Sequence, residues 1–347
     1  MISTPQNGSA SNLLLPISAD VLAVGEVAVD LISDQSAETL ADVDAFRRHL
    51  GGEVANVALN VARLGGRSAL VARVGDDGFG VAVRRSLEGA GVDVSHVSCD
   101  PIEPTSLIAV TRQTGTPDFL PYRGADRNLE PAMLPSLDGV RVVHSSAFAL
   151  SLEPTRTTVL DAFRRAAAAG ALVSLDPNYH PIVWRRRAED AQRVLRDAFA
   201  FVDLTKPSLD DCARLFGPGL QPGEYARRFL DWGARRVVIS MGRAGVLLVD
   251  GAGVETHFQA VPVPVVDVTG AGDALWAGLL LALIDGQSID IAVLAGMAAA
   301  EHKLQHVGHI RVGVSRNDLY RHAVERLAGR SLPRPMADLT THDRTGG

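Results

Sequence analysis

The clearest chemistry in this sequence lies in a run of small residues that ends in an acid, Gly270-Ala271-Gly272-Asp273. Residues this small let backbone N–H groups converge on a bound group, and N–H groups at a helix N-terminus favour an anion. A carboxylate would repel a simple bound anion. Both the N–H groups and the carboxylate are explained if Asp273 removes a proton as a base while the turn stabilises the negative charge that develops on a phosphate. Taken alone, Asp273 could equally be a helix-capping acid.

A second glycine-rich segment runs from Gly51 to Gly66 and contains Gly52 and Asn56. The glycine pair would let a ligand approach the backbone, and Asn56 can both donate to and accept from hydroxyl groups. An ordinary strand-to-helix turn would look the same in isolation. The sequence contains no Gly-x-x-x-x-Gly-Lys-Ser/Thr, and Gly25-Glu-Val-Ala-Val lacks the dinucleotide-binding fingerprint, which argues against a nicotinamide-dependent dehydrogenase.

Composition limits the classes of function. The 347 residues are 46% hydrophobic, which supports a large core, and the net charge of −6 argues against a nucleic-acid partner. The longest apolar stretch, residues 274–284, is too short to span a bilayer, and Met1 to Asp20 lacks the pattern of a signal peptide. Two cysteines fit a reducing compartment. We therefore expect a cytoplasmic protein with no membrane partner.

Strand-like and helix-like segments alternate along the chain, which predicts an α/β fold with a mostly parallel central sheet sandwiched by helices. Residues 29–50 and 105–123 interrupt this order and predict a small β-sheet lid. Polar ends at 1–18 and 331–347 read as a flexible arm and tail around a domain at 19–330. The predicted strands are 21–25, 68–74, 140–144, 171–175, 201–204 and 236–240, and the predicted helices are 54–64, 79–90, 155–168, 191–199, 274–284 and 289–304.

Both glycine-rich segments have counterparts in one family. Over residues 21–308 the chain resembles the ribokinase-like (phosphofructokinase-B type) carbohydrate kinases. The segment 51–66 resembles their first signature and 267–278 their second, in the same order. Val74-Gly-Asp-Asp-Gly-Phe-Gly80 also fits, and the segment 175–184, which contains Asp-Pro-Asn, is similar to one in fructokinases and 2-keto-3-deoxygluconate kinases. Two signatures in order are far more specific than either alone.

The resemblance implies an ATP-dependent sugar kinase in which Asp273 takes the proton from a sugar hydroxyl as it attacks the γ-phosphate. It also implies a Mg²⁺ ion held by Asp211 through water, with ATP and the sugar as small-molecule partners and a homodimer formed through the lid. The implied residues are Gly270, Ala271 and Gly272 for the transferring phosphoryl group; Asp30, Gly51, Gly52, Asn56 and Arg123 for the sugar; Ser208, Ser240, Gly242 and Gly245 for ATP; and Asp267 and Thr269 for a monovalent cation such as K⁺.

The chain departs from the family pattern at two places. Ser208 and Asp211 stand where members usually carry Asn and Glu, and His180 stands where fructokinases and 2-keto-3-deoxygluconate kinases commonly carry Arg. The loss of that Arg disfavours an acidic sugar, so fructose is the favoured substrate. The alternatives are 2-keto-3-deoxygluconate, a nucleoside, or a catalytically idle sugar sensor. We do not expect His302, His306 and His309 to bind zinc. They are expected at the surface or in the adenine pocket.

Overall fold

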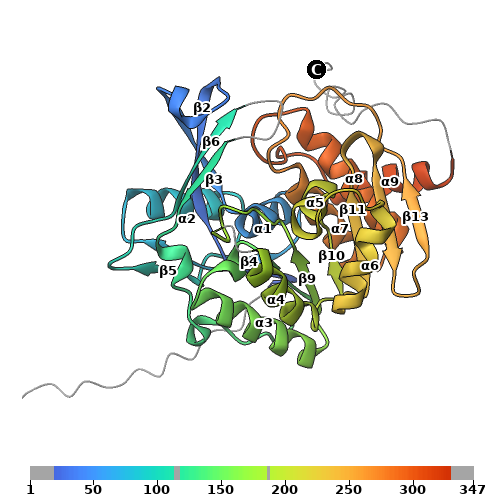
Figure 1. Ribbon diagram of the computed structural model, residues 1–347, viewed down its shortest axis with the longest axis horizontal. Coiled ribbons are helices and arrows are strands. Elements are labelled where there is room, and N and C mark those ends of the chain that lie inside the picture. Colours follow the sequence, from blue (N-terminus) through green and yellow to red (C-terminus); the bar gives the residue numbers. More distant parts are fainter. Residues whose placement is uncertain (1–18, 113–117, 186–187, 330–347) are drawn as a thin grey trace, which may run out of the picture.

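The computed structural model describes residues 19–112, 118–185 and 188–329, which form two β-sheets and their covering helices (Figure 1). The predicted arm at 1–18 and tail at 331–347 lie outside the described residues. In the described part no helix is long and apolar enough to cross a membrane.

The large sheet has the strand order β13-β12-β11-β10-β9-β8-β1-β4-β5. All neighbouring pairs are parallel except those that β12 makes with β11 and β13. The mostly parallel sheet is therefore confirmed. Its strands are β1 Val21–Val24, β4 Ser68–Gly75, β5 Val97–Asp100, β8 Val142–Ser146, β9 Leu172–Asp176, β10 Leu204–Thr205, β11 Arg236–Ser240, β12 Val246–Asp250 and β13 Glu255–Phe258.

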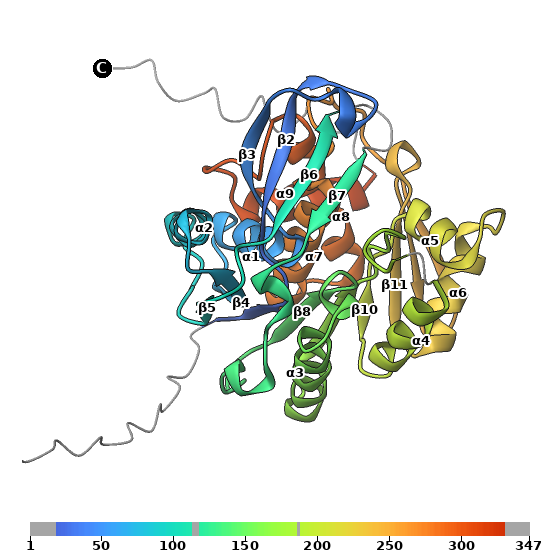
Figure 2. The same cartoon turned by 60° about the vertical axis from the view of Figure 1, so that its left-hand side comes forward.

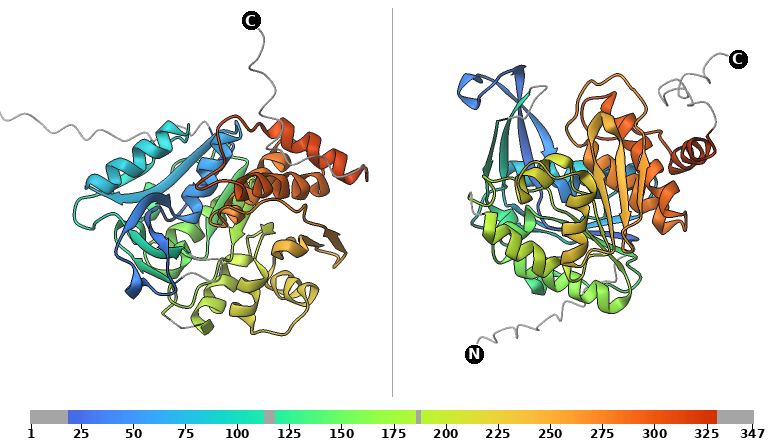
Figure 3. Two further views of the ribbon diagram at one scale, coloured as in Figure 1. Left: turned by 90° about the horizontal axis from the view of Figure 1, so that it is seen from above. Right: turned by 45° about the vertical axis from the view of Figure 1, so that its right-hand side comes forward.

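Helices cover both faces of this sheet (Figure 3). On one face pack α3 Thr155–Ala169, α4 Ala188–Phe199, α5 Leu209–Phe216 and α6 Pro222–Trp232; on the other pack α1 Glu53–Arg63, α2 Gly78–Gly89, α7 Ala271–Ile284, α8 Ile289–Leu304 and α9 Arg316–Leu327. Short 3-10 helices lie at Leu40–Asp42, Ala125–Arg127, Pro131–Met133, Ala149–Ser151 and Gly242–Ala244.

Hydrophobic periodicity located the long elements to within a few residues and missed several amphipathic or short ones. The strand expected at 201–204 is shorter and lies later, as β10 at Leu204–Thr205. Helices α5, α6 and α9 were not predicted. The β-branched run at 261–268 forms no strand, because Pro262 and Pro264 cannot donate to a ladder. That run is a loop beside the start of α7.

The second sheet stands above the first (Figure 2), as the two interruptions of the βα order predicted. It has the order β3-β2-β6-β7, from Phe46–Gly51, Ala28–Ser36, Leu107–Arg112 and Phe119–Tyr122. Only the central β2–β6 pair is parallel. We call this sheet the lid sheet.

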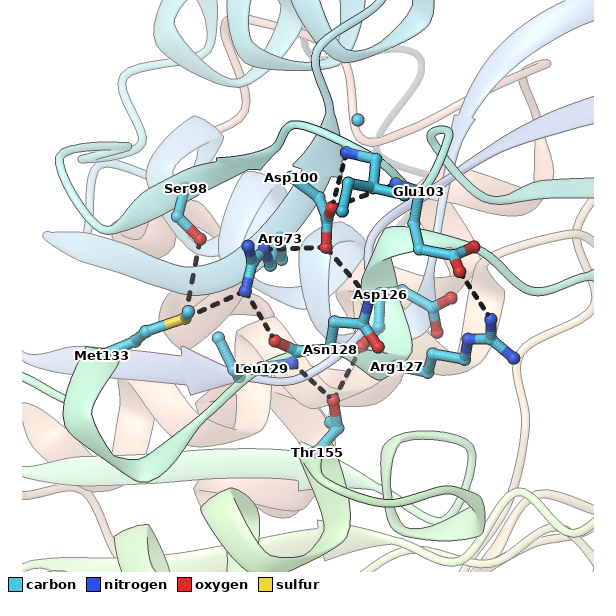
Figure 4. A network of polar contacts seen from close by, with 12 residues as sticks. Arg73, Ser98, Asp100, Glu103, Asp126, Arg127, Asn128, Leu129, Met133 and Thr155 are labelled. Carbon is cyan, nitrogen blue, oxygen red and sulfur yellow. Dashed lines mark hydrogen bonds and ion pairs between the residues drawn. The ribbon is translucent and has the colours of Figure 1, made fainter.

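A buried polar network joins β4 and β5 of the main sheet to the segment after β5 and to Asn128 (Figure 4). Arg73 on β4 lies 3.2 Å from Asp100 Oδ2 and donates to the Asn128 carbonyl at 3.0 Å. Asp100 also accepts from the Asn128 side chain and from backbone N–H groups of residues 102 and 103. Led by the Asn128 hydrogen bond, these donors lower the pKa of Asp100 to about 2.

We predict that Asp100→Ala destabilises the protein by about 3–5 kcal/mol, because it leaves the buried Arg73 without its carboxylate. Urea denaturation measures this loss. The matched control is Asp34→Ala, which removes an exposed partner of Arg47 and should cost less than about 1 kcal/mol. Since folding lowers the pKa of Asp100, its contribution is complete above about pH 4 and is lost as the pH falls toward 2. Equal losses in the two variants would contradict the role of the network.

Candidate active site

The predicted catalytic turn begins helix α7. Gly270 is the N-cap residue and adopts a left-handed conformation with φ of 76°, which favours glycine. Ala271 and Gly272 form the first turn together with Asp273. Ala271 N already donates to the Val268 carbonyl at 3.2 Å, so the N–H groups that this helix start leaves for a ligand are those of Gly272 and Asp273.

Asp273 is held by a residue from the first glycine-rich segment. Asn56 on α1 donates from Nδ2 to Asp273 Oδ2 at 2.8 Å, across 217 positions of sequence. Its other atom, Oδ1, lies 2.8 Å from His309 Nε2. An amide oxygen can only accept, so His309 donates from Nε2. The structure therefore brings the two signatures together and adds His309, which we had expected at the surface or the adenine pocket.

The environment of Asp273 tunes it as a base. Burial, partly offset by the Asn56 hydrogen bond, raises the pKa of Asp273 to about 6. A base with a pKa near the working pH removes a proton most effectively. Burial also lowers the pKa of His309 to about 4, so this ring is neutral when it orients Asn56.

This pKa predicts how the reaction depends on pH. The base must be deprotonated and the sugar acid Asp30 has a pKa of about 7, so kcat/KM should level off only above about pH 8 and fall at least tenfold per pH unit well below pH 6. Initial rates from pH 5 to 9 with both substrates far from saturation measure the profile. A rate that stays level down to pH 5 would contradict the assignment of Asp273 as the base.

The predicted sugar residue Asp30 lies on β2 and pairs with His49 of β3, two residues before Gly51. Its Oδ1 is buried and has no hydrogen-bond partner among the described residues. Burial and the nearby Asp273 raise its pKa to about 7. A Cβ on Gly51 would lie 2.0 Å from Asp30 Oδ1, so glycine keeps this carboxylate accessible. A sugar hydroxyl would supply the missing donor.

Further polar side chains, not predicted from the sequence, lie near Asp273, and we call them together with Asp30 the sugar pocket. Glu26 follows β1 and accepts from Val54 N and Ser146 Oγ. Asn178 donates to Glu53 Oε2 at 2.9 Å, while Glu53 Oε1 is buried without a described partner. Burial raises the pKa of both glutamates, that of Glu26 to about 7. The signal that could have identified them is their place directly after Gly25 and Gly52.

Replacing Asp30 by Asn should separate sugar binding from stability. Loss of a charged acceptor should raise the sugar KM roughly 10- to 100-fold. Because folding raises the pKa of Asp30, its charge destabilises the native state above about pH 7, so the Asn variant should unfold roughly 2–4 °C higher at pH 8. Asp34→Asn on the same strand is the control and should leave KM unchanged. A D30N variant with unchanged KM would refute the sugar role.

A lysine completes the catalytic surroundings. Lys206 follows β10, and its Nζ lies 3.1 Å from Asp176 Oδ2 at the end of β9. The same oxygen accepts from Trp276 Nε1 at 2.6 Å. Burial alone would lower the pKa of Lys206, but Asp176 and Glu53 raise it above its ordinary value, so the side chain is charged. A Cβ on Gly272 would lie 3.3 Å from Nζ, which puts the ammonium beside the catalytic turn.

An apolar cavity of about 460 Å³ lies on the other side of that turn. It reaches from the β11–β12 turn to α8, and its volume is in the range typical of small-ligand sites. The predicted ATP residues Ser240, Gly242 and Gly245 line it together with Ala271 and Gly272. Helix α8 contributes Met297, Ala300 and Leu304 to its lining.

The two departures at 208 and 211 form a capping box at the start of α5. Ser208 Oγ accepts from Asp211 N, and Asp211 Oδ2 accepts from Ser208 N, both at 3.0 Å. Ser208 also forms a β-bridge to Ser240, so it lies beside the cavity residues. Burial and the nearby Asp176 raise the pKa of Asp211 to about 6. Within the described residues, no three His, Cys, Asp or Glu side chains gather to hold a metal ion.

Two other predicted positions have partners of their own. Arg123 donates to Asp126 at 2.6 Å and Ser151 at 2.9 Å, and its guanidinium lies 4.0 Å from the Phe148 ring centre. Its contact with sugar stays a prediction. Asp267 accepts from the N–H of the exposed Thr269 at 3.0 Å, at the start of the catalytic turn. His180 contacts Phe119 of the lid sheet, with 4.9 Å between ring centres.

The fold and this arrangement define a class of enzyme. A carboxylate at a helix start, between a pocket rich in hydroxyl acceptors and an apolar cavity, is suited to phosphoryl transfer onto a polyhydroxylated acceptor. Residues 18–314 match the model of the pfkB family carbohydrate kinases. The chain belongs to this family and is an ATP-dependent carbohydrate kinase.

Three similar proteins illustrate the relationship. The chain is 34% identical to an ATP-dependent 6-phosphofructokinase of Thermoanaerobacterium thermosaccharolyticum, over 84% of this chain and 89% of that protein. It is 35% identical to a fructokinase of Klebsiella pneumoniae, over 77% and 85%. A Vibrio cholerae fructokinase structure with fructose, ADP and potassium bound has a TM-score of 0.76 at 28% identity, over 87% and 97%.

Proposed function

We propose that the protein transfers the γ-phosphate of ATP to a hydroxyl of a neutral ketohexose, with fructose as the preferred substrate. The observation that carries this proposal is the position of Asp273, at the catalytic turn and next to the pocket that contains Asp30. In this mechanism Asp273 takes the hydroxyl proton. Backbone N–H groups of the turn and the Lys206 ammonium stabilise charge on the transferring group.

The charge of the sugar pocket favours a neutral substrate over an acidic or phosphorylated one. Its free acceptors include carboxyl oxygens of Asp30 and Glu53, which suit the hydroxyl groups of a sugar and offer no positive charge to hold an anion. Burial and the nearby Arg214 lower the pKa of His180, so it brings no positive charge at neutral pH. The Arg123 guanidinium is already paired with Asp126. Both 2-keto-3-deoxygluconate and fructose 6-phosphate are therefore less suitable.

Magnesium fits the donor chemistry near Lys206, where the buried Asp176 Oδ1 has no described partner and Asp211 lies close by. Mg²⁺ prefers oxygen ligands and usually retains several waters. Asp211 would hold it through water, next to the Asp176 carboxylate. When bound, it would neutralise phosphate charge. We propose that the reaction takes place in the cytoplasm, where ATP is available.

We also propose a homodimer formed through the lid sheet. Phe46, Leu120 and Tyr122 lie on its edge strands, and each is at least 39% exposed. Pairing of two lids would cover these side chains. Light scattering during size-exclusion chromatography would report a dimer, and a monomer at tens of micromolar protein would contradict it.

An ADP-release screen tests the function. Magnesium-ATP is combined with fructose, fructose 6-phosphate, 2-keto-3-deoxygluconate, ribose or a nucleoside, and Asp273→Asn is run in parallel. We expect turnover of fructose that disappears in the variant. Turnover confined to fructose 6-phosphate or 2-keto-3-deoxygluconate would refute the neutral substrate. Sugar binding without any turnover would instead favour the idle sensor.

A further inference from the structure

Lys303, in the last turn of α8, is a second buried lysine near the catalytic turn, after Lys206. Its side chain has no exposed surface. Its Nζ lies 2.8 Å from the backbone oxygen of Asp267 and 2.8 Å from Asp267 Oδ2. These two contacts connect the end of α8 to the segment that leads into the catalytic turn.

The other contacts of the Asp267 side chain occupy both of its carboxylate oxygens. Oδ1 accepts from Thr269 N at 3.0 Å, and Gly308 N lies 3.4 Å from Oδ2. Burial alone would raise the pKa of Asp267, but hydrogen bonds from Lys303 and Thr269 hold it below its usual value. Burial lowers the pKa of Lys303, but the Asp267 carboxylate raises it in turn and two oxygens lie 2.8 Å from Nζ, so the pair is an ammonium and a carboxylate.

A monovalent cation does not fit this arrangement. K⁺ is held in proteins by several oxygen atoms that replace its water shell. At this turn, two oxygens of Asp267 already contact an ammonium group, which is similar to K⁺ in charge and size. A second positive charge on the same oxygens would be repelled by Lys303 at close range.

We infer that the Lys303 ammonium takes the place of the monovalent cation predicted at Asp267 and Thr269. The aliphatic part of Lys303 supports this role, because a Cβ on Gly270 would lie 4.0 Å from its Cε. Lys303 thus holds the turn from 267 to 270 and adds a fixed positive charge near Asp273. The enzyme needs no K⁺ for activity, an inference that rests on the proposed kinase reaction.

The test compares wild type, Lys303→Ala and Lys303→Met in chloride salts of K⁺, NH₄⁺, Na⁺ or choline at one ionic strength, with ATP supplied as its Tris salt. Wild-type kcat should vary less than about twofold among the salts. Lys303→Ala opens space for a cation, so its kcat should fall about 10- to 100-fold in choline and recover at least several-fold in K⁺ or NH₄⁺. Lys303→Met fills that space without charge and should not recover.

Thermal unfolding gives a readout independent of turnover. The Tm of Lys303→Ala should rise by several degrees when K⁺ replaces choline, whereas wild type and Lys303→Met should not respond. If no sugar is phosphorylated, the proposed function fails while this measurement still tests the cation replacement. Activation of wild type fivefold or more by K⁺, or full activity of Lys303→Ala in choline, would overturn the inference. If Lys303→Ala does not fold, the wild-type salt comparison and Lys303→Met still decide it.

Discussion

Asp273→Asn should lower kcat about 1,000-fold, within the 100- to 10,000-fold range of general-base catalysis. Asparagine keeps the shape of the side chain but cannot take a proton from the sugar. Since Asn56 donates to Asp273 Oδ2, the amide can retain this contact through its oxygen. Sugar and ATP affinities should therefore change little, and steady-state kinetics with calorimetric binding measures both effects.

A matched control tests the alternative that Asp273 is only a helix-capping acid. Asp290 occupies the first turn of the neighbouring α8, so Asp290→Asn removes the same charge from the same kind of helix position. It should leave kcat unchanged and alter stability by less than about 1 kcal/mol. If both variants lose activity alike, or if Asp273→Asn keeps more than a tenth of the wild-type kcat, the catalytic role is refuted.

The sequence predicted the parts of the site that depend on local backbone chemistry. Gly270 was identifiable because helix α7 starts in a left-handed conformation, which favours glycine. Gly51 was identifiable because the Asp30 carboxylate lies too close for any side chain at that position. Long elements such as α8 were identifiable from their apolar content. By contrast, the contact between Asn56 and His309 joins residues 253 positions apart, and no local pattern encodes such a pair. His309 could only be found once the fold was known.

The two lysines show what composition could have added. Lys206 and Lys303 are the chain's only lysines among 34 basic residues, and both are buried at the catalytic turn. By itself, the scarcity of lysine indicates only a bias of composition. Yet arginine's planar guanidinium cannot replace a compact ammonium in a small space, so lysine kept in an arginine-rich chain points to a specific contact.

Lys206→Met should lower kcat about 100-fold or more, the effect typical of removing one well-placed donor to transition-state charge. Nζ is close enough to Gly272 to reach a phosphoryl group held at the turn, and Met retains most of the side chain's volume. The substitution also leaves the buried Asp176 without its ion-pair partner, which by itself would destabilise the fold.

A second substitution separates these two effects. Asp176→Asn combined with Lys206→Met removes the unpaired charge and can keep the side-chain contact with Trp276 Nε1. The double variant should recover most of the Tm lost by Lys206→Met without recovering kcat, because the ammonium is still absent. If kcat returned together with Tm, Lys206 would act only by neutralising Asp176. Asp176→Asn alone is the control, because Asp176 also lies at the proposed magnesium site. A loss of kcat in the stable double variant well beyond that of Asp176→Asn would mean that the lysine charge acts on the transferring phosphoryl group.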